Sequence, residues 1–526
     1  MNRQGTNGAS ALARTARPFV LAGMVLMFAG LAGRLLTYPL NRDEHLFIAS
    51  SAELPHGELY RDLGYNHLPN LPYLLSGIYR VTGTEHLLLT GRIVMLLFWV
   101  AALVALWLIG RVLNAGVVAI TVAMVLLMGS VLLLGEPGML VTNNFLPIPL
   151  ALLAFYFLLR GLDETSPSAA SAFLAGVCVS LAVGLKANYI FLAPSFAVTT
   201  LLAPAVRPFR ERVLRSFLPL ALGGLLGGIP TIAYLATDAQ TILAHTVGYF
   251  TDLQTAYWAH STQPQISSIA ARVLLAEDVW LSNASLLSLV GLVALFFIPV
   301  VARGVSAGLR LFWHWPLLLL LFIIGFGFVV AFVPTPSFPQ YFVPPMPFII
   351  VAILVMFARL DEAEQAQAVP ILLAIGLLAL VGSASRILPG LPNLARPSAW
   401  SGIKVHREAR TLAQLANLKH GEKVATLSPV LALEAGASVY PEFASGQFVY
   451  RVADYIAPSD RHFYRTTSQR DLPAFLDASA PRAIIVNSDE PIEHAFLTYA
   501  QTRGYREVIR PEGTKPGTMR LFVAPN

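Results

Sequence analysis

Charged residues are scarce in this chain: 13% of its 526 residues are Asp, Glu, Lys or Arg, whereas 56% are hydrophobic. One soluble core cannot hide that much apolar surface, so the composition excludes an ordinary soluble protein. Cysteine is almost absent. Cys178 stands alone inside an apolar run, which excludes an internal disulfide and indicates a small packing residue.

The formal net charge of +6 does not indicate a nucleic-acid partner. The basic residues fall in short clusters between apolar runs, and no basic face interleaved with aromatic residues is found. Short basic clusters between apolar runs are typical of cytoplasmic loops in membrane proteins.

Long apolar runs predict a polytopic α-helical membrane protein of about eleven transmembrane helices. The first run follows three arginines and exceeds the apolar core of a signal peptide, so we interpret it as a retained span after a cytoplasmic tail, residues 1–17. The predicted spans are 18–40, 87–110, 116–134, 145–159, 169–185, 189–202, 217–236, 285–302, 311–333, 347–360 and 369–380.

A cytoplasmic N-terminus places the basic clusters, such as residues 207–215, in cytoplasmic loops. Four segments then face outward: 41–86, 136–144, 238–283 and 334–346. These segments are rich in His, Tyr, Trp, Asn and carboxylates, so we expect chemistry on the outer side.

The first external segment, residues 41–86, carries two adjacent carboxylates just after the first span. Asn41 and Glu44 have the spacing of a helix capping box, which accounts for Glu44. Asp43 is not needed by such a cap, although an acidic first turn also suits the helix dipole. We interpret Asp43 as a functional candidate.

Three motifs in order resemble the GT-C glycosyltransferases that use polyprenyl-phosphate sugars, as in protein O-mannosyltransferases and lipid A aminoarabinose transferases. The resemblance covers residues 18–385. It rests on Asp43-Glu44 followed by Gly57, Tyr60 and Asp62; on Gly184-Leu185-Lys186-Ala187-Asn188-Tyr189; and on Gln340-Tyr341-Phe342-Val343-Pro344-Pro345-Met346-Pro347. One departure is Thr142-Asn143-Asn144, where many members carry an aspartate.

The resemblance implies transfer of a hexosyl or pentosyl group to a lipid, glycan or protein acceptor outside the membrane, without a cofactor. Asp43 would remove the proton of the attacking hydroxyl, with Glu44 beside it. Lys186 and Arg61 would stabilise the leaving phosphate. Further candidate substrate-binding residues are Asp62, Tyr65, His67 and Tyr341.

The lysine and the tyrosines among these residues also have a structural interpretation. A lysine at the end of a span often extends to the lipid headgroups, and interfacial tyrosines usually form an aromatic belt. Lys186 is nevertheless expected on the outer side, where the positive-inside rule disfavours cations. The histidines show no paired metal spacing, so no metal site is predicted.

After Arg386 the composition becomes that of a soluble domain, residues 386–526, which we expect to be small, α/β and periplasmic. Predicted strands are 423–427, 483–486, 505–509 and 520–523, with helices at 472–478 and 491–503. No glycine-rich fingerprint indicates a nucleotide site.

Two other functions remain open from the sequence. A transporter or flippase of lipid-linked sugars would have inverted repeats with broken helices, and no convincing repeat is found. An O-antigen ligase or polymerase would concentrate arginines and a histidine in one late loop. The expected location is a bacterial inner membrane, and the lipid bilayer is an expected partner.

Overall fold

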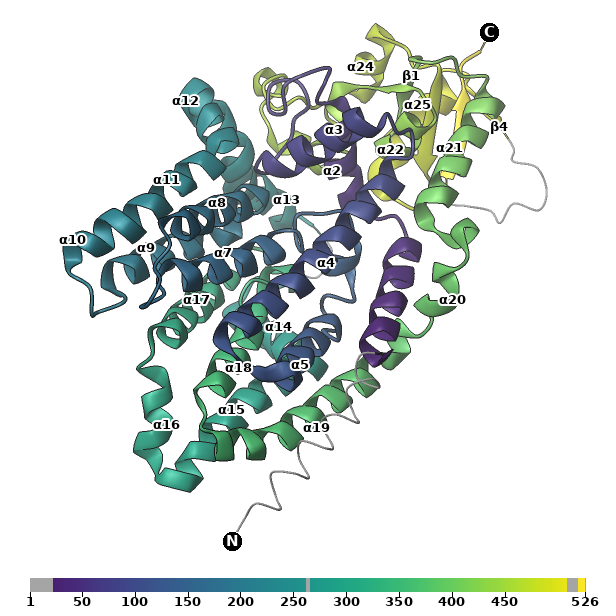
Figure 1. Cartoon of the computed structure of the whole chain (residues 1–526). Helices are drawn as coiled ribbons and strands as arrows, with labels where there is room; N and C mark the ends of the chain where they lie inside the picture. Colours follow the sequence, from purple (N-terminus) through teal and green to yellow (C-terminus); the bar gives the residue numbers. More distant parts are fainter. Residues whose placement is uncertain (1–21, 262–264, 509–518, 526) are drawn as a thin grey trace.

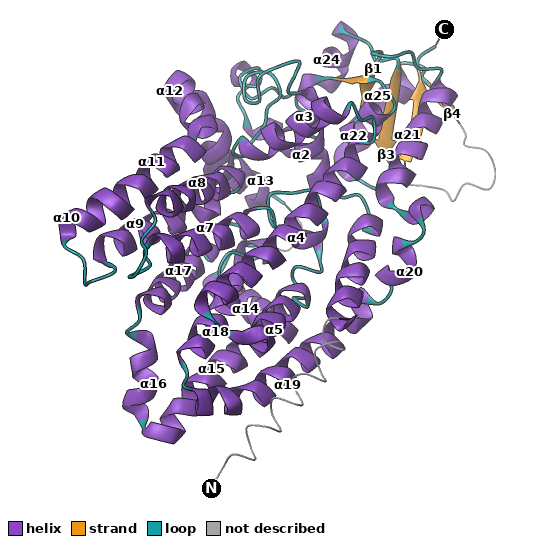
Figure 2. Cartoon of the chain, in the orientation of Figure 1, coloured by secondary structure: helices purple, strands orange, loops and turns teal. Residues whose placement is uncertain are grey.

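The computed structural model describes residues 22–261, 265–508 and 519–525, most of them in helices (Figure 1). Figure 2 shows the strands gathered at one end of a long helical body. The predicted helical membrane class is confirmed, because four described helices are long and apolar enough to cross a bilayer. These are α4 (Leu87–Leu113), α15 (Asn283–Arg303), the segment Pro339–Arg359 that ends in α18 (Met346–Arg359), and α19 (Glu362–Ile387).

Three bent helix pairs raise the number of possible spans to seven. They are Ala22–Thr37 with α2 (Arg42–Glu53), bent by 79°; Phe209–Gly227 with Ile229–Ala259, bent by 66°; and α16 (Val305–Phe312) with α17 (Trp315–Ala331), bent by 75°. Shorter apolar helices are α5 (Gly116–Met128), α7 (Pro147–Gly161), α8 (Ala169–Leu185) and Ala187–Leu202, which comprises η1 and α9. The count of eleven stays a prediction.

Small residues allow two of these helices to pack backbone against backbone. A Cβ atom on Gly176 of α8 would lie 1.9 Å from the Leu220 carbonyl oxygen of α11 (Leu218–Gly227). A Cβ on Gly223 of α11 would lie equally close, at 1.9 Å, to the Phe173 carbonyl oxygen. Helices in lipid associate through such close approach, since burial of apolar surface gives little driving force there.

The helix α3 (Asn70–Thr82) follows α2, and α14 (Ile269–Trp280) precedes α15. Between them, α12 (Ile229–Leu243) continues into the π-helix η3 (Ala244–Leu253) and α13 (Gln254–Ala259), and η3 and α13 contact the C-terminal unit through Tyr249 and Gln254. Asp238 has non-helical dihedral angles inside α12, which marks a kink in this long segment.

Residues 401–508 and 519–523 form a unit of helices around a five-stranded sheet with the order β2-β1-β3-β5-β4. β1 (Lys423–Ala425) pairs in parallel with β2 (Ser438–Val439) and β3 (Ala483–Asn487), whereas β5 (Met519–Val523) is antiparallel to β3 and β4 (Arg506–Val508). The flanking helices include α21 (Ser401–Ala416), α22 (Pro429–Glu434), α24 (Leu472–Ala478) and α25 (His494–Thr502). The predicted strand 505–509 ends at 509, outside the described residues, and β2 was not predicted.

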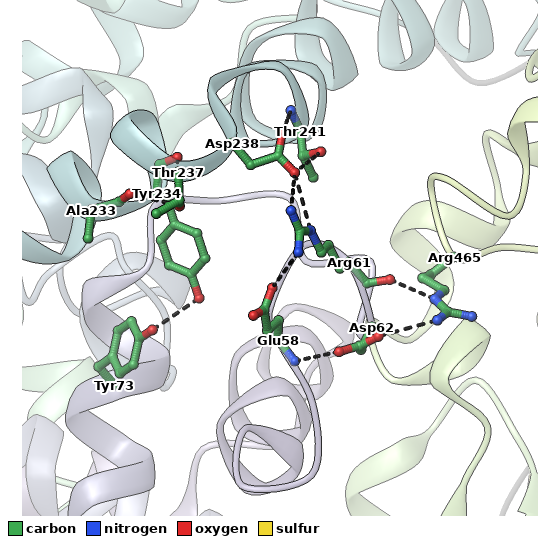
Figure 3. A network of polar contacts seen from close by, with 10 residues as sticks. All are labelled: Glu58, Arg61, Asp62, Tyr73, Ala233, Tyr234, Thr237, Asp238, Thr241 and Arg465. Carbon is green, nitrogen blue, oxygen red and sulfur yellow. Dashed lines mark hydrogen bonds and ion pairs between the residues drawn. The ribbon is translucent and has the colours of Figure 1, made fainter.

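An ion-pair network ties the first external segment to α12 and to the C-terminal unit (Figure 3). Arg61 binds Asp238 at 2.8 Å, and Arg465 binds Asp62 at 3.3 Å. Ser445 adds a hydroxyl that donates to the Leu63 and Gly64 carbonyl oxygens, both at 3.0 Å.

Glu434 of the C-terminal unit caps a membrane helix. The first residues of α4 lack a side-chain cap from their own chain segment, and the Leu88 N–H donates to Glu434 Oε1 at 2.9 Å. The second oxygen, Oε2, lies 3.2 Å from His406 Nδ1. Burial raises the pKa of Glu434 to about 8, so the folded protein retains this proton near neutral pH.

This raised pKa predicts a pH dependence of stability. The folded state binds the Glu434 proton more tightly than the unfolded state, so the contribution is fully present below about pH 4.5 and is lost as the pH rises toward about 8. We expect Glu434→Gln, which cannot ionise and can still cap α4, to flatten the fall of the apparent unfolding temperature across this range. Glu422→Gln, in the same unit, serves as the control. Identical pH slopes for Glu434→Gln and the unchanged protein would contradict the assignment.

Candidate active site

A cavity of about 1740 Å³ lies between the membrane helices and the C-terminal unit. Its lining comes from α2, from the turn before α7, from the α8–η1 junction, from α12 to α14, from η4 (Pro339–Phe342) and from the C-terminal unit. The charged and aromatic lining residues used below are Asp43, His67, Lys186, Trp258, Tyr341 and Arg451.

Asp43 reaches this cavity from the first turn of α2. The Asn41 side chain accepts the Asp43 N–H and completes a capping box with Glu44, so the predicted cap is confirmed. The Asp43 side chain is 27% exposed and its nearest cation is Arg42, at 3.7 Å. Burial raises the pKa of Asp43, while Arg42, Arg451 and Lys186 oppose the shift. A carboxylate with a raised pKa is a better proton acceptor.

Glu44 is fully buried and is absent from the cavity lining. Its Oε2 atom lies 2.6 Å from Arg92 Nη2, and its Oε1 atom accepts the Val141 N–H at 2.8 Å. These contacts connect α2 to α4 and to the turn before α7. Through these contacts Glu44 would have a positioning role for α2, and its predicted catalytic role stays a prediction.

Lys186 lies where α8 ends, with extended dihedral angles that separate α8 from η1 (Ala187–Phe191). The side chain is buried, and Nζ donates to Asn144 Oδ1 at 2.5 Å. The Tyr341 ring centre is 5.5 Å from Nζ. An amide in place of a carboxylate at position 144 leaves the lysine hydrogen-bonded but without a neutralising charge at that contact.

Arg451 enters the cavity from the C-terminal unit and was not identified from the sequence. It is 7% exposed and stacks over the Phe448, Tyr257 and Trp258 rings at 4.8, 5.3 and 5.4 Å. Among the described residues it forms no ion pair; Gln254 Oε1 accepts from it at 3.4 Å, and its Nε atom has no hydrogen-bond partner. A buried cation in this state favours an anionic ligand.

Of the other predicted site residues, some line the cavity and others lie outside its lining. His67 lines the cavity, with Nδ1 2.7 Å from Asn66 Oδ1. Tyr65 is fully buried outside the lining. Arg61 and Asp62 also lie outside the lining, in the network of Figure 3. Arg61 forms an ion pair with Asp238, and its predicted contact with the donor phosphate stays a prediction.

In the part of the chain that the structure describes, no group of three or more His, Cys, Asp or Glu side chains could hold a metal ion. Asp43 shares the cavity with two buried basic side chains, Lys186 and Arg451.

The family described as dolichyl-phosphate-mannose-protein mannosyltransferase matches residues 66–251. This match includes Asn144 and Lys186, and the whole fold recurs in solved glycosyltransferase structures. The resemblance to GT-C glycosyltransferases that the motifs predicted is confirmed by this match over residues 66–251 and by the shared fold.

The particular similar structures are those of ArnT from Cupriavidus metallidurans. The apo state is 13% identical with a TM-score of 0.59, over 97% of this chain and 98% of that chain. The form bound to undecaprenyl phosphate is 13% identical with a TM-score of 0.56, over 96% and 97%. The mycobacterial arabinofuranosyltransferase AftD is 16% identical with a TM-score of 0.49, over 97% of this chain and 40% of that one. No curated protein matches the sequence.

The two adjacent carboxylates lie in different surroundings, so substituting each of them should affect the stability of the protein differently. Glu44→Gln leaves the Arg92 charge buried and unpaired, which should lower the free energy of unfolding by about 3–5 kcal/mol. Asp43→Asn should leave the apparent unfolding temperature close to that of the unchanged protein. Thermal unfolding in detergent measures both, with the exposed Glu58→Gln as control. Equal stability of Glu44→Gln and the unchanged protein would refute the positioning role.

Proposed function

We propose that the protein transfers a sugar from a polyprenyl-phosphate donor to an acceptor hydroxyl on the outer face of a bacterial inner membrane. The observation that carries this proposal is the juxtaposition of Asp43 with two buried cations, Lys186 and Arg451, in one cavity. The carboxylate accepts a proton, and the cations receive a phosphate.

The donor phosphate would lie between Lys186 and Arg451. Each cation is buried, and neither has a carboxylate within ion-pair distance among the described residues. A charge held in such a low-dielectric site interacts strongly with an incoming anion. Support also comes from ArnT, which was solved with undecaprenyl phosphate bound.

The lipid chain of the donor would follow the apolar wall formed by α12 and η3. Leu235, Leu243 and Val247 line the cavity and are 41%, 49% and 51% exposed. Exposed apolar side chains along a cavity suit the hydrocarbon tail of a ligand whose polar head lies deeper in it.

In the transfer step, the acceptor hydroxyl attacks the anomeric carbon of the donor sugar while Asp43 takes the hydroxyl proton. A new C–O bond forms as the bond between the anomeric carbon and the phosphate oxygen breaks, and polyprenyl phosphate leaves with the bonding electron pair. Lys186 and Arg451 stabilise the charge that develops on the phosphate. Tyr341, beside Lys186, would position the donor.

The sharpest test of this step is Asp43→Asn. Asn has nearly the size of Asp but cannot take a proton, so transfer should fall about 10²- to 10⁴-fold while undecaprenyl phosphate still binds. Release of polyprenyl phosphate from a panel of polyprenyl-phosphate sugars measures transfer. Glu58→Gln, outside the cavity, controls for purification. Transfer within about threefold of the unchanged protein would remove Asp43 from the role of base.

A further inference from the structure

The C-terminal unit directs the carboxyl ends of two parallel strands into the cavity. Leu427 and Ser428, which follow β1, line it together with Asn487 at the end of β3. Glu490 and Glu493, in the segment that follows β3, line it as well. This end of the sheet therefore forms a wall of the same cavity that holds Asp43.

The strand order marks this end of the sheet as a place where ligands bind in α/β proteins. The chain passes from β1 to β2 on one side of it and then crosses back to β3 on the other side, so the strand order reverses at β1. In open α/β sheets, ligands bind in the crevice at the carboxyl ends of strands where the order reverses. Here that crevice opens into the cavity.

The polar groups of this crevice suit hydroxyl groups. Glu493 is buried, and its Oε2 atom accepts the Asn487 N–H at 2.7 Å, which fixes its orientation. Burial and the neighbouring Glu490 raise the pKa of Glu493 to about 7, so this carboxyl can donate as well as accept a hydrogen bond near neutral pH. Of the lysines and arginines in the described part of the chain, Arg42, Lys186 and Arg451 line the cavity.

His45 is a second, independent sign of a ligand. It lies on α2 two residues after Asp43, lines the cavity, is 7% exposed, and its Nδ1 atom has no hydrogen-bond partner. A Cβ on Gly446 would lie 3.4 Å from His45 Cβ and 3.3 Å from the Leu427 carbonyl oxygen, so His45 is next to the end of β1. A buried polar atom without a partner is costly unless a ligand completes it.

We propose that Ser428, Asn487, Glu490, Glu493 and His45 form the acceptor subsite, and that it takes a sugar head group without an anionic substituent. Carboxyl, amide and hydroxyl groups are the partners that pair with sugar hydroxyls. An anionic acceptor would meet the carboxyl groups of Glu490 and Glu493, and such like-charge contacts are strongly unfavourable. This inference rests on the proposed function, because it assigns the acceptor side of the same site.

The test uses two probes that differ at one position of the sugar, octyl glucoside and the anionic octyl glucuronide, below their micellar concentrations. Their binding to the purified full-length protein is measured by calorimetry in a non-sugar detergent. We expect the glucoside to bind at least about tenfold more tightly than the glucuronide. The ratio should shrink in Glu490→Gln and again in the Glu490→Gln, Glu493→Gln double variant.

Asp489→Asn is the matched control, since Asp489 is exposed in the same turn and does not line the cavity. Its ratio should equal that of the unchanged protein. Undecaprenyl phosphate is measured with every variant, which checks folding and keeps the two proposals separate. Absence of undecaprenyl phosphate binding to the unchanged protein would overturn the donor assignment. With that binding intact, equal affinity for the two glycosides, no glycoside binding, or a ratio unaffected by the glutamine variants would overturn the acceptor subsite.

Discussion

The buried ion pair between Glu44 and Arg92 joins the helices beside the cavity. Besides the 2.6 Å contact with Glu44, the Arg92 guanidinium donates to the Leu35 and Met139 carbonyl oxygens, both at 2.7 Å. One side chain of α4 thereby joins the first described helix, α2 and α6 (Glu136–Met139). Buried charges are costly unless fully paired, so this junction tolerates little rearrangement.

The same junction positions both halves of the proposed chemistry. Glu44 fixes the first turn of α2, from which Asp43 enters the cavity. Its other oxygen binds the Val141 N–H, and three residues later Asn144 accepts from Lys186. The base and the cation are thus attached to one rigid polar cluster, which suits a site that must be preorganised.

The C-terminal unit completes the cavity instead of merely covering it. It caps α4 through Glu434, contributes Arg451 to the donor side, and presents the ends of β1 and β3 on the proposed acceptor side.

Local patterns were sufficient to predict part of this arrangement. The capping box of Asn41 and Glu44, the helical membrane class and most strands of the sheet follow from sequence spacing and periodicity. β2 was not predicted because a strand of two residues is too short to show an alternating pattern. The exact number of spans could not be predicted either, because helices as short as α5 do not show by length whether they cross the bilayer. Local spacing also placed Lys186 at the junction of two helices, where the structure has it.

Long-range pairings could not be predicted in this way. In the sequence Arg92 is a single charged residue in an apolar helix. No local sequence pattern connects it to Glu44, which is 48 positions away. Arg451 lies in a different unit from Asp43, so no local pattern connects the two. Nothing local shows that Arg61 pairs with Asp238 either, because the two residues are 177 positions apart. Asn144 had one signal, its place where related chains carry an aspartate.

The most direct test of a shared site between the two parts of the chain is the affinity for undecaprenyl phosphate after removal of each buried cation. Loss of a charge-assisted contact is worth about 1.5–3 kcal/mol, so Lys186→Gln and Arg451→Gln should each weaken binding by about tenfold or more. Arg465→Gln, which removes a cation outside the cavity lining, should leave it unchanged. Full affinity in Arg451→Gln would contradict the account, because the donor phosphate would then be bound without the C-terminal unit.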